Sequence, residues 1–514
     1  MDIVSAQTKA GLFADAIASA RQLEEGYHRT DALKDIAVAQ AEAGLFADAL
    51  STALPIEEDY HRTEALKGIA LAQAEAGRFA DAQSTAQRIK EDWRRASALG
   101  AIAAVQANAG RGEDARAAFQ DALSVARQVE YAEWRAKALR AIAAAQVEAG
   151  HLAEARSTLA EAISSTRQMT HDRWRAEVLW EIGATQAEAG RPQDARATFR
   201  VALSTAEQIE DAHYRAQALV GIASAQAEAG LFVDALSTAE QIKGTRERTW
   251  ALERIAAAQR KAERFADALS TALKIEEATY RDWAVVEVAR AQARAGRFAD
   301  AVAAASRIEE GSCRAQAISF IAWTHVEAGH FADAASTAQE IEQAFSRAAV
   351  LKGIVAGQAK VGRFADAFST VAQIDDPFWR AEALAAIGSA QAKVGRAEEA
   401  RVALSDALSA ARQVEHARWR AEALAAIGSA QAEMGQAEDA RAAFADAIAS
   451  ARRVELAMDR ALVFNQIAAT QVEVGHVEEA LALAAEVLQS EGQAHYGRTL
   501  LSVARALLQT KAGA

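Results

Sequence analysis

Cysteine and proline are scarce in this chain of 514 residues. Cys313 is the only cysteine, which excludes an internal disulfide and a thiolate zinc site and fits a reducing compartment. Proline occurs only three times, and no stretch rich in Ser, Pro or Gly separates one part from another. The sequence therefore contains no recognisable linker that would divide it into ordinary domains.

Positive charge is also in deficit, because 57 Lys and Arg stand against 70 Asp and Glu and give a formal net charge of -13. Nucleic acid and anionic membrane surfaces are bound through clustered Lys and Arg, so we expect neither as the main partner. No apolar run approaches the roughly 20 residues of a membrane helix. The start of the chain lacks the basic and apolar regions of a signal peptide, which predicts a soluble, cytoplasmic protein.

What the chain does contain is a repeat. The letters RAEALAAIGSAQA stand at 380–392 and again at 420–432. Three residues after each copy stands a Gly that ends QAEAG or a variant of it, and we call this residue the marker. Every unit has a marker, and Glu263 takes the place of the Gly once. Successive markers are 33 or 40 residues apart and predict fourteen units. The glycine markers are Gly11, Gly44, Gly77, Gly110, Gly150, Gly190, Gly230, Gly296, Gly329, Gly362, Gly395, Gly435 and Gly475.

Each unit is predicted to be a helical hairpin. Before Gly77, the residues Leu66, Ile69, Ala70 and Gln73 are spaced by three and four, as on one face of a helix. The Gly ends that helix by adopting a left-handed conformation. An Asp or Glu stands four residues after every marker, where it suits the dipole and the free amides at the start of a second helix.

The two repeat lengths differ by seven residues inserted in the second helix, which add roughly two turns. We predict one continuous array over 1–514, because no linker interrupts the repeats. Its predicted parts are short repeats at about 1–110, long repeats at 111–230, short repeats at 231–395, long repeats at 396–475 and a C-terminal cap at 476–514.

This pattern resembles the tetratricopeptide repeat (TPR) family over essentially the whole chain. The matching residues of one unit are Leu66, Ile69, Ala70, Gly77, Phe79 and Ala82. The chain departs from the family in having Leu for its Trp, Gln73 for its Tyr, no closing Pro, and a period other than 34. The longer units resemble those of kinesin-light-chain and MalT-like regulators. The resemblance implies an all-α, right-handed superhelical solenoid of about fourteen hairpins plus a C-terminal helix.

The sequence contains none of the common catalytic, metal-binding or phosphate-binding motifs: it has no Gly-rich phosphate loop, HExxH, CxxC or GxSxG. The ten histidines are dispersed, and the closest pair, His325 and His330, straddles the marker Gly329. The sequence disfavours a metal site there. The carboxylates recur at structural positions, so we expect no catalysis, no cofactor and no metal.

Two ladders of polar residues each have two open interpretations. An Arg stands fifteen residues before every marker from Gly44 onward, and it either bridges repeats through acidic residues or lines a groove that binds carboxylates. A Gln stands four residues before every marker except Gly329, where His325 replaces it. It either forms hydrogen bonds between adjacent first helices or binds a ligand. For both ladders the sequence favours the structural role.

Function is sought where a unit departs from its siblings. In TPR arrays the first helices line a concave groove, through positions that mostly hold Ala, Ser, Glu or Lys here. Central units place aromatic and basic residues at them, the types most often found in binding hot spots. The alternative is that these Trp fill gaps beside small Ala neighbours. The predicted groove residues are Trp180, Trp250, Trp283, Arg260, Lys261, Arg290, Arg294, Trp323, Lys352 and Lys360.

The predicted function is a non-catalytic scaffold or adaptor that binds a protein segment carrying acidic and apolar residues. The alternative is the ligand- or peptide-sensing part of a MalT-like signalling regulator whose effector domain is absent from this chain. RNA binding is disfavoured by the acidic balance. Met1 falls midway through a first helix, so self-association through an open N-terminal end is a further expectation, and 498–508 is expected to form a final capping helix.

Overall fold

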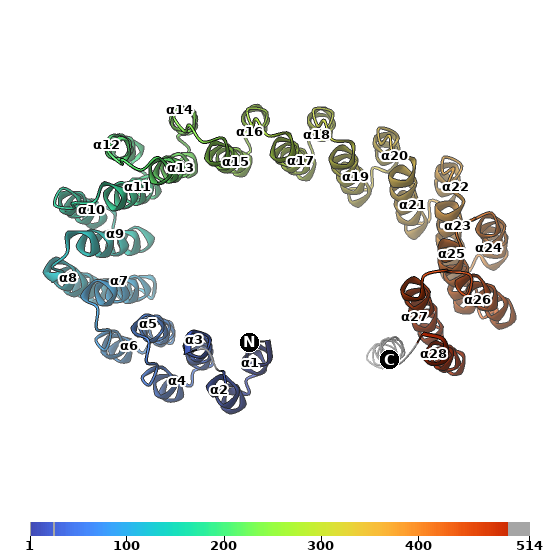
Figure 1. Ribbon diagram of the computed structural model, residues 1–514, viewed down its shortest axis with the longest axis horizontal. Helices are drawn as coiled ribbons and strands as arrows, with labels where there is room; N and C mark the ends of the chain where they lie inside the picture. Colours follow the sequence, from blue (N-terminus) through green and yellow to red (C-terminus); the bar gives the residue numbers. More distant parts are fainter. Residues whose placement is uncertain (1, 24–25, 492–514) are drawn as a thin grey trace. The chain divides into compact units, whose positions relative to one another are not determined.

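The computed structural model describes residues 2–23 and 26–491, and every regular element in that part of the chain is an α-helix (Figure 1). Twenty-eight helices form fourteen hairpins, which confirms the predicted all-α repeat fold. The expected helix at 498–508 lies outside the described residues. The first helices are α1 Asp2–Lys9, α3 Gly26–Glu42, α5 Asp59–Glu75, α7 Asp92–Asn108, α9 Ala132–Glu148, α11 Asp172–Glu188, α13 Ala212–Glu228, α15 Thr245–Lys261, α17 Ala278–Arg294, α19 Gly311–Glu327, α21 Ala344–Lys360, α23 Pro377–Lys393, α25 Ala417–Glu433 and α27 Ala457–Glu473.

The second helices carry all of the variation in repeat length. From α3 onward every first helix has 17 residues, whereas second helices have eight or nine residues in short repeats and 15 to 17 in long ones. The second helices are α2 Phe13–Arg21, α4 Phe46–Ala53, α6 Phe79–Ala86, α8 Gly112–Gln128, α10 Leu152–Thr166, α12 Pro192–Glu207, α14 Phe232–Glu240, α16 Phe265–Ala272, α18 Phe298–Ala305, α20 Phe331–Gln339, α22 Phe364–Val371, α24 Ala397–Arg412, α26 Ala437–Ala451 and α28 Val477–Glu491.

The chain forms two compact units, Met1–Glu276 with α1 to α16 and a second that begins at Glu277 with α17. Within each unit a first helix packs against its own second helix and against the next first helix, as α5 does with α6 and α7, and α19 with α20 and α21. Within each unit the second helices also contact the first helix that follows them, as α6 does with α7 and α20 with α21. A continuous array over the whole chain, with its right-handed superhelix, stays a prediction.

The turn of each hairpin has the conformation that the marker glycines predict. All thirteen marker glycines have φ between 72° and 88°. At Gly77 the N–H of the next residue, Arg78, donates to the carbonyl of Gln73 at 2.8 Å, which is the 6→1 hydrogen bond of a Schellman cap. The fourteenth marker, Glu263, adopts φ 56° and is the only non-glycine residue with positive φ among those described.

The acid that follows each marker lies in the first turn of the second helix, as the sequence predicts. Asp81 accepts a hydrogen bond from Nε of Arg78 at 2.7 Å, and Asp366 accepts one from Arg363 at the same distance. These side chains are about half exposed on both partners, so each pair contributes little stability by itself. The negative charge still lies in the first turn, where it suits the helix dipole.

Small apolar residues form the core. Ala65, Ile69 and Ala70 of α5 are almost fully buried, and their counterparts recur through the first helices. The connector after each second helix adds another buried apolar residue, such as Ile89 after α6 and Ile341 after α20. Because Ala side chains are short, adjacent helices approach closely, and each hairpin buries its apolar face only by stacking on its neighbours.

We predict that Glu263→Gly stabilises the chain by about 1 kcal/mol, because a left-handed backbone costs a residue with a Cβ roughly that amount and costs Gly nothing comparable. The measurement is the urea midpoint of unfolding followed by circular dichroism. Gly296→Glu, the reverse change at the next marker, should destabilise by a similar amount. Equal midpoints for the two variants and the wild type would contradict this account of the turn.

Candidate functional site

In three repeats the ladder Gln accepts a hydrogen bond from the second helix of its own hairpin, whereas the sequence suggested hydrogen bonds between adjacent first helices. The hydroxyl of Thr85 on α6 donates to Oε1 of Gln73 on α5 at 2.8 Å, and Thr238 donates in the same way to Gln226 at 2.7 Å. In ten other repeats the buried Oε1 has no hydrogen-bond partner among the described residues. They are Gln7, Gln106, Gln146, Gln186, Gln259, Gln292, Gln358, Gln391, Gln431 and Gln471.

The Arg ladder binds main-chain carbonyls, which neither sequence interpretation anticipated. In nine repeats the guanidinium donates to the carbonyl six residues earlier, in the connector that follows the preceding second helix. Arg347, for example, donates from Nη1 to Ile341 at 2.6 Å. The ladder thus satisfies carbonyls that the end of a helix leaves free. These nine residues are Arg62, Arg95, Arg135, Arg215, Arg248, Arg314, Arg347, Arg380 and Arg460.

Some ladder arginines also bridge repeats through acidic residues. Arg281 pairs with Glu309 at 2.8 Å, and Arg314 pairs with Glu342 at 3.1 Å. Both acids lie in the connector that leads to the next first helix, Glu309 after α18 and Glu342 after α20. The ladder is therefore structural: it fixes where each first helix starts and links it to the next repeat.

The predicted groove residues are divided between the two compact units. In the first unit Trp180 lies on α11, where a Cβ on Gly221 of α13 would come within 2.7 Å of its ring. Trp250 on α15 is 37% exposed, and the guanidinium of Arg246 lies 4.7 Å from its ring centroid. Arg260 and Lys261 stand at the end of the same helix.

In the second unit Trp283, Arg290 and Arg294 follow one another along α17 at spacings of seven and four, so they share a face of that helix. The guanidinium groups of Arg290 and Arg294 lie 5.3 and 5.1 Å from the ring centroid of Phe320 on α19. Phe320 was not identified from the sequence. Arg290 also pairs with Glu287 at 3.0 Å, while its buried Nε has no hydrogen-bond partner within the described residues.

Trp323, on α19, combines a packing role with exposure. A Cβ on Gly353 of α21 would lie 2.0 Å from its indole ring, so the glycine is required for that ring to lie against α21. The side chain nevertheless remains 44% exposed. Lys352 pairs with Glu382 of the next repeat at 2.8 Å, and Lys360 stands exposed at the end of α21.

Aromatic and cationic side chains form a ladder along the starts of the first helices. This ladder was not identified from the sequence. The rings of Trp93 and Trp134 stack at 4.7 Å, and Lys137 lies 5.2 Å from the ring centroids of both Trp134 and Trp174. Its sequence signal is the aromatic residue that often precedes a ladder arginine, as Trp134 precedes Arg135. This ladder adds contacts between successive first helices of the first unit.

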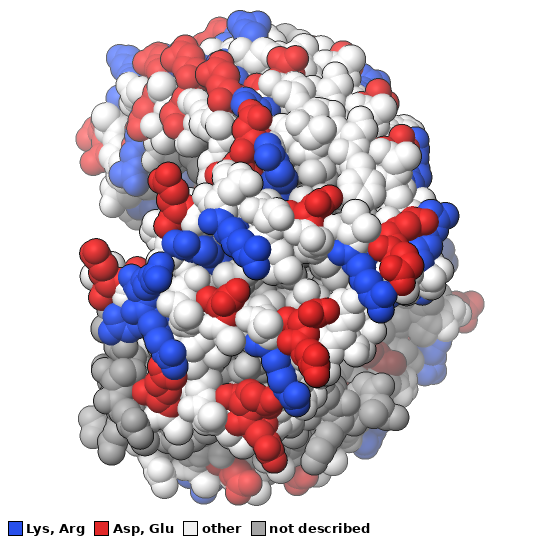
Figure 2. All heavy atoms as spheres, turned by 90° about the vertical axis from the view of Figure 1, so that its right-hand side faces the viewer, with Lys and Arg blue, Asp and Glu red and all other residues white. Residues whose placement is uncertain are grey.

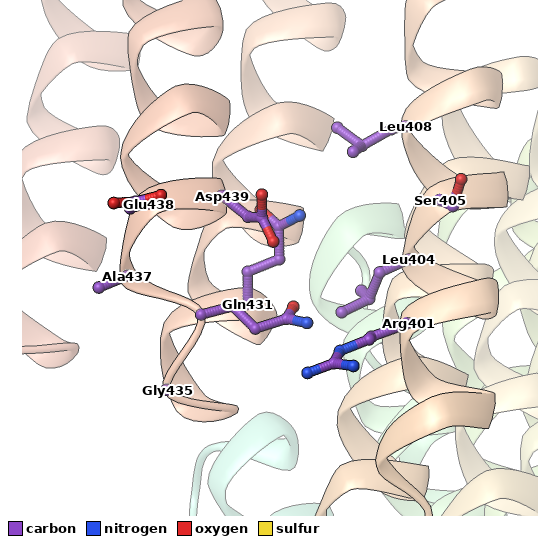
Figure 3. Close-up of a pocket in the computed structure, with 10 residues that line it drawn as sticks. Arg401, Leu404, Ser405, Leu408, Gln431, Gly435, Ala437, Glu438 and Asp439 are labelled. Carbon is purple, nitrogen blue, oxygen red and sulfur yellow. The ribbon is translucent and has the colours of Figure 1, made fainter.

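Cavities lie between successive second helices. Figure 3 shows one of about 570 Å³, into which Arg401 and Leu404 of α24 and Gln431 of α25 point. Similar recesses occur at three other junctions, each bordered by a Gln of the ladder and by the turn of the following repeat. We call this feature the inter-repeat recess. It arises because consecutive repeats pack mainly through their first helices.

Charge is mixed on the face drawn in Figure 2, where acidic and basic side chains lie interspersed among uncharged surface. Within the part of the chain that the structure describes, no helix has both the length and the apolar character needed to span a bilayer.

Cys313 lies in the first turn of α19, beside the residue that caps that helix. The carboxylate of Glu310 accepts hydrogen bonds from the backbone N–H of Ser312 at 3.0 Å and of Cys313 at 2.7 Å. Hydrogen bonds from Cys313 and Ser312 lower the pKa of Glu310 to about 2. Burial, together with the Glu310 carboxylate, raises the pKa of the Cys313 thiol to about 11.

We predict that Arg347→Ala lowers the free energy of unfolding by about 2 kcal/mol, because it removes a charged donor from partly buried carbonyls. The measurement is again the urea midpoint. Arg401→Ala is the matched control, since Arg401 forms an exposed pair with Glu398 whose loss costs about 0.5 kcal/mol or less. Equal effects of the two substitutions would show that the carbonyl contacts contribute nothing special.

We also predict slow alkylation of Cys313 by iodoacetamide at pH 8, because a thiol with a pKa of about 11 is almost entirely protonated there. Glu310→Gln removes the neighbouring negative charge, lowers the thiol pKa and accelerates the reaction. The chain unfolded in urea gives the rate of an unperturbed cysteine as a reference. A wild-type rate equal to that reference would contradict the raised pKa.

Comparison with solved structures gives several similar proteins. Three solved structures share 13 to 19% identity with the chain. Ton1535 from Thermococcus onnurineus NA1 covers 62% of this chain and 98% of its own (TM-score 0.34, 19% identity). Naa15/Naa10 bound to HypK-THB covers 94% and 79% (TM-score 0.29, 13%), and the pentatricopeptide repeat protein PPR10 from maize covers 99% and 87% (TM-score 0.26, 13%).

Comparison with curated proteins found no match. The family model described as "Tetratricopeptide repeat" matches residues 94–168, which span α8, α9 and α10 with most of α7. The match confirms the resemblance to the tetratricopeptide repeat over residues 94–168. The hairpins on either side carry the same turn, Arg and Gln positions.

Proposed function

We propose that the chain is a non-catalytic interaction scaffold whose first helices bind a protein segment that carries acidic and apolar residues. The TPR-like fold is typical of such scaffolds. The observation that carries the proposal is the pair Trp283 and Trp323, which are 45% and 44% exposed on the neighbouring helices α17 and α19. Half-exposed Trp of this kind is the residue type most enriched in binding hot spots.

Basic residues on the same helices supply the charge for an acidic partner. Arg294 is exposed and lies against Phe320, which holds its guanidinium near the α17–α19 junction. Arg290 keeps a buried Nε without an acceptor among the described residues, and a carboxylate of the bound segment supplies one. Lys360 adds a charge at the exposed end of α21.

Not every predicted residue supports binding equally. Lys352 is compensated by Glu382, and Trp180 contacts the position of Gly221, so both have structural partners already. Trp250, Arg260 and Lys261 form a second, smaller surface on α15 of the first unit. Arg260 occupies the position three residues before the marker, which in several other repeats holds a buried Ala such as Ala293 or Ala359. This repeat therefore has a large cation where most repeats have Ala.

The proposal is tested by selecting binders to the whole chain from a displayed peptide library. Selected peptides should combine Asp or Glu with large apolar residues and should bind more weakly as salt concentration rises. The double substitution Trp283→Ala and Arg294→Ala should weaken the best peptide by at least about 2 kcal/mol, roughly thirtyfold. Binding is measured by fluorescence anisotropy of the labelled peptide.

The matched control is Arg173→Ala with Trp174→Ala. Trp174 is 37% exposed and has Arg173 over its ring at 5.6 Å, but it belongs to the aromatic ladder at the helix starts. This control should leave peptide affinity unchanged. Equal weakening by both double variants, or selected peptides without acidic residues, would overturn the proposed surface.

A further inference from the structure

The turn between α19 and α20 brings together three side chains that can bind a metal. His325 lies near the end of α19, His330 at the first position beyond the marker Gly329, and Asp333 in the first turn of α20. One ligand atom from each, two imidazole nitrogens and a carboxylate oxygen, all lie within 4.8 Å of one another. The three residues therefore converge on one small volume.

His325 is the fixed member of this group. Its side chain is 5% exposed, and its Nδ1 is buried with no hydrogen-bond partner among the described residues. The ring of Phe298 on α18 stacks on it at 3.7 Å with an interplanar angle of 22°, which fixes its orientation. A buried polar nitrogen without a partner carries a desolvation cost that a bound ligand would remove.

The other two members are free to adjust. His330 and Asp333 are both exposed, and the His330 ring lies 6.1 Å from that of His325. Ligands at about 2.1 Å from a tetrahedral ion are roughly 3.4 Å apart, so the three atoms must approach by no more than about 1.4 Å. Side-chain rotation of two exposed residues suffices for that, with His325 held in place.

Comparison with the sibling repeats singles out this turn. The position of His325 is Gln in all thirteen other units, and the position of His330 is most often Arg. Two other units also have a His and an acid at the positions of His330 and Asp333, namely His151 with Glu154 and His476 with Glu479. Both units keep Gln at the position of the buried His325, as Gln146 and Gln471. Two substitutions in one unit have thus replaced an amide and a cation by two imidazoles beside the acid that every unit has.

We propose that His325, His330 and Asp333 form a binding site for one divalent transition-metal ion of the Zn²⁺ or Co²⁺ class. Imidazole nitrogen and carboxylate oxygen suit these borderline ions, whereas Ca²⁺ and Mg²⁺ require more oxygen ligands. Three protein ligands leave a fourth position open to water or to a donor from a partner. Bound metal joins the last turn of α19 to the first turn of α20 and stabilises that hairpin.

Burial also acts on the His325 imidazole. Desolvation is the largest influence on it and lowers its pKa, while Asp333 raises the pKa and His330 lowers it.

The test uses the full, untagged chain after chelator treatment and removal of the chelator. Isothermal titration with ZnCl₂ should give one equivalent per chain, and CoCl₂ should give the intense visible absorption of a four-coordinate site. His325→Gln should weaken Zn²⁺ binding at least about tenfold. This variant restores the residue found in every sibling repeat, so its circular dichroism spectrum should match that of the wild type.

Two further variants make the result specific. His330→Arg, again the sibling residue, should abolish the cobalt spectrum, whereas His151→Arg in a repeat without the buried His should leave it unchanged. Gln146→His completes the same set beside His151 and Glu154 and should add a second equivalent. Absence of stoichiometric zinc binding by the wild type would overturn the proposal, as would binding that His325→Gln leaves intact. Peptide binding by the first-helix surface does not depend on either result.

Discussion

Close packing between successive first helices is the constraint on which the rest of each unit depends. A hairpin of two short helices cannot bury its own apolar face, so it must be covered by the next hairpin. Ala at the contact positions lets the helices approach, and a constant length of 17 residues keeps each first helix in register with its neighbours. The second helices contact this layer from one side only, so they are free to be long or short.

Such packing leaves polar groups inside the structure, and the repeat satisfies them in a fixed way. Nine ladder arginines bind a carbonyl of the connector that follows the preceding second helix, as Arg347 does with Ile341. The Schellman turn at each marker satisfies the end of the first helix. Gln73 accepts a hydrogen bond from Thr85 within its hairpin. In ten of its counterparts the side-chain Oε1 accepts no hydrogen bond from the described residues. The inter-repeat recess is where these amides meet open space.

Function is then expected at the positions where a unit gives up the common residue. Trp323 requires Gly353 to accommodate its ring and is still 44% exposed, so it combines packing with a surface open to a partner. His325 replaces the amide of its siblings and acquires an unpartnered nitrogen beside His330 and Asp333. Both departures lie on α19, so the proposed peptide surface and the proposed metal site occupy different faces of one hairpin.

The sequence by itself determined the fold class, the number of hairpins, their turns and the helices that absorb the extra seven residues, because each depends on local spacing and on glycine conformation. It did not determine partners that lie in other helices. The Arg ladder was expected to bind acids, and in nine repeats it also binds a main-chain carbonyl. The Gln ladder was expected to bond between first helices, and three of its members bond within their own hairpin. Phe320 beside Arg294, and the convergence of His325 with His330 and Asp333, likewise became visible only in three dimensions. Sequence period fixes which face a residue occupies, but only the packing of helices brings two such faces together.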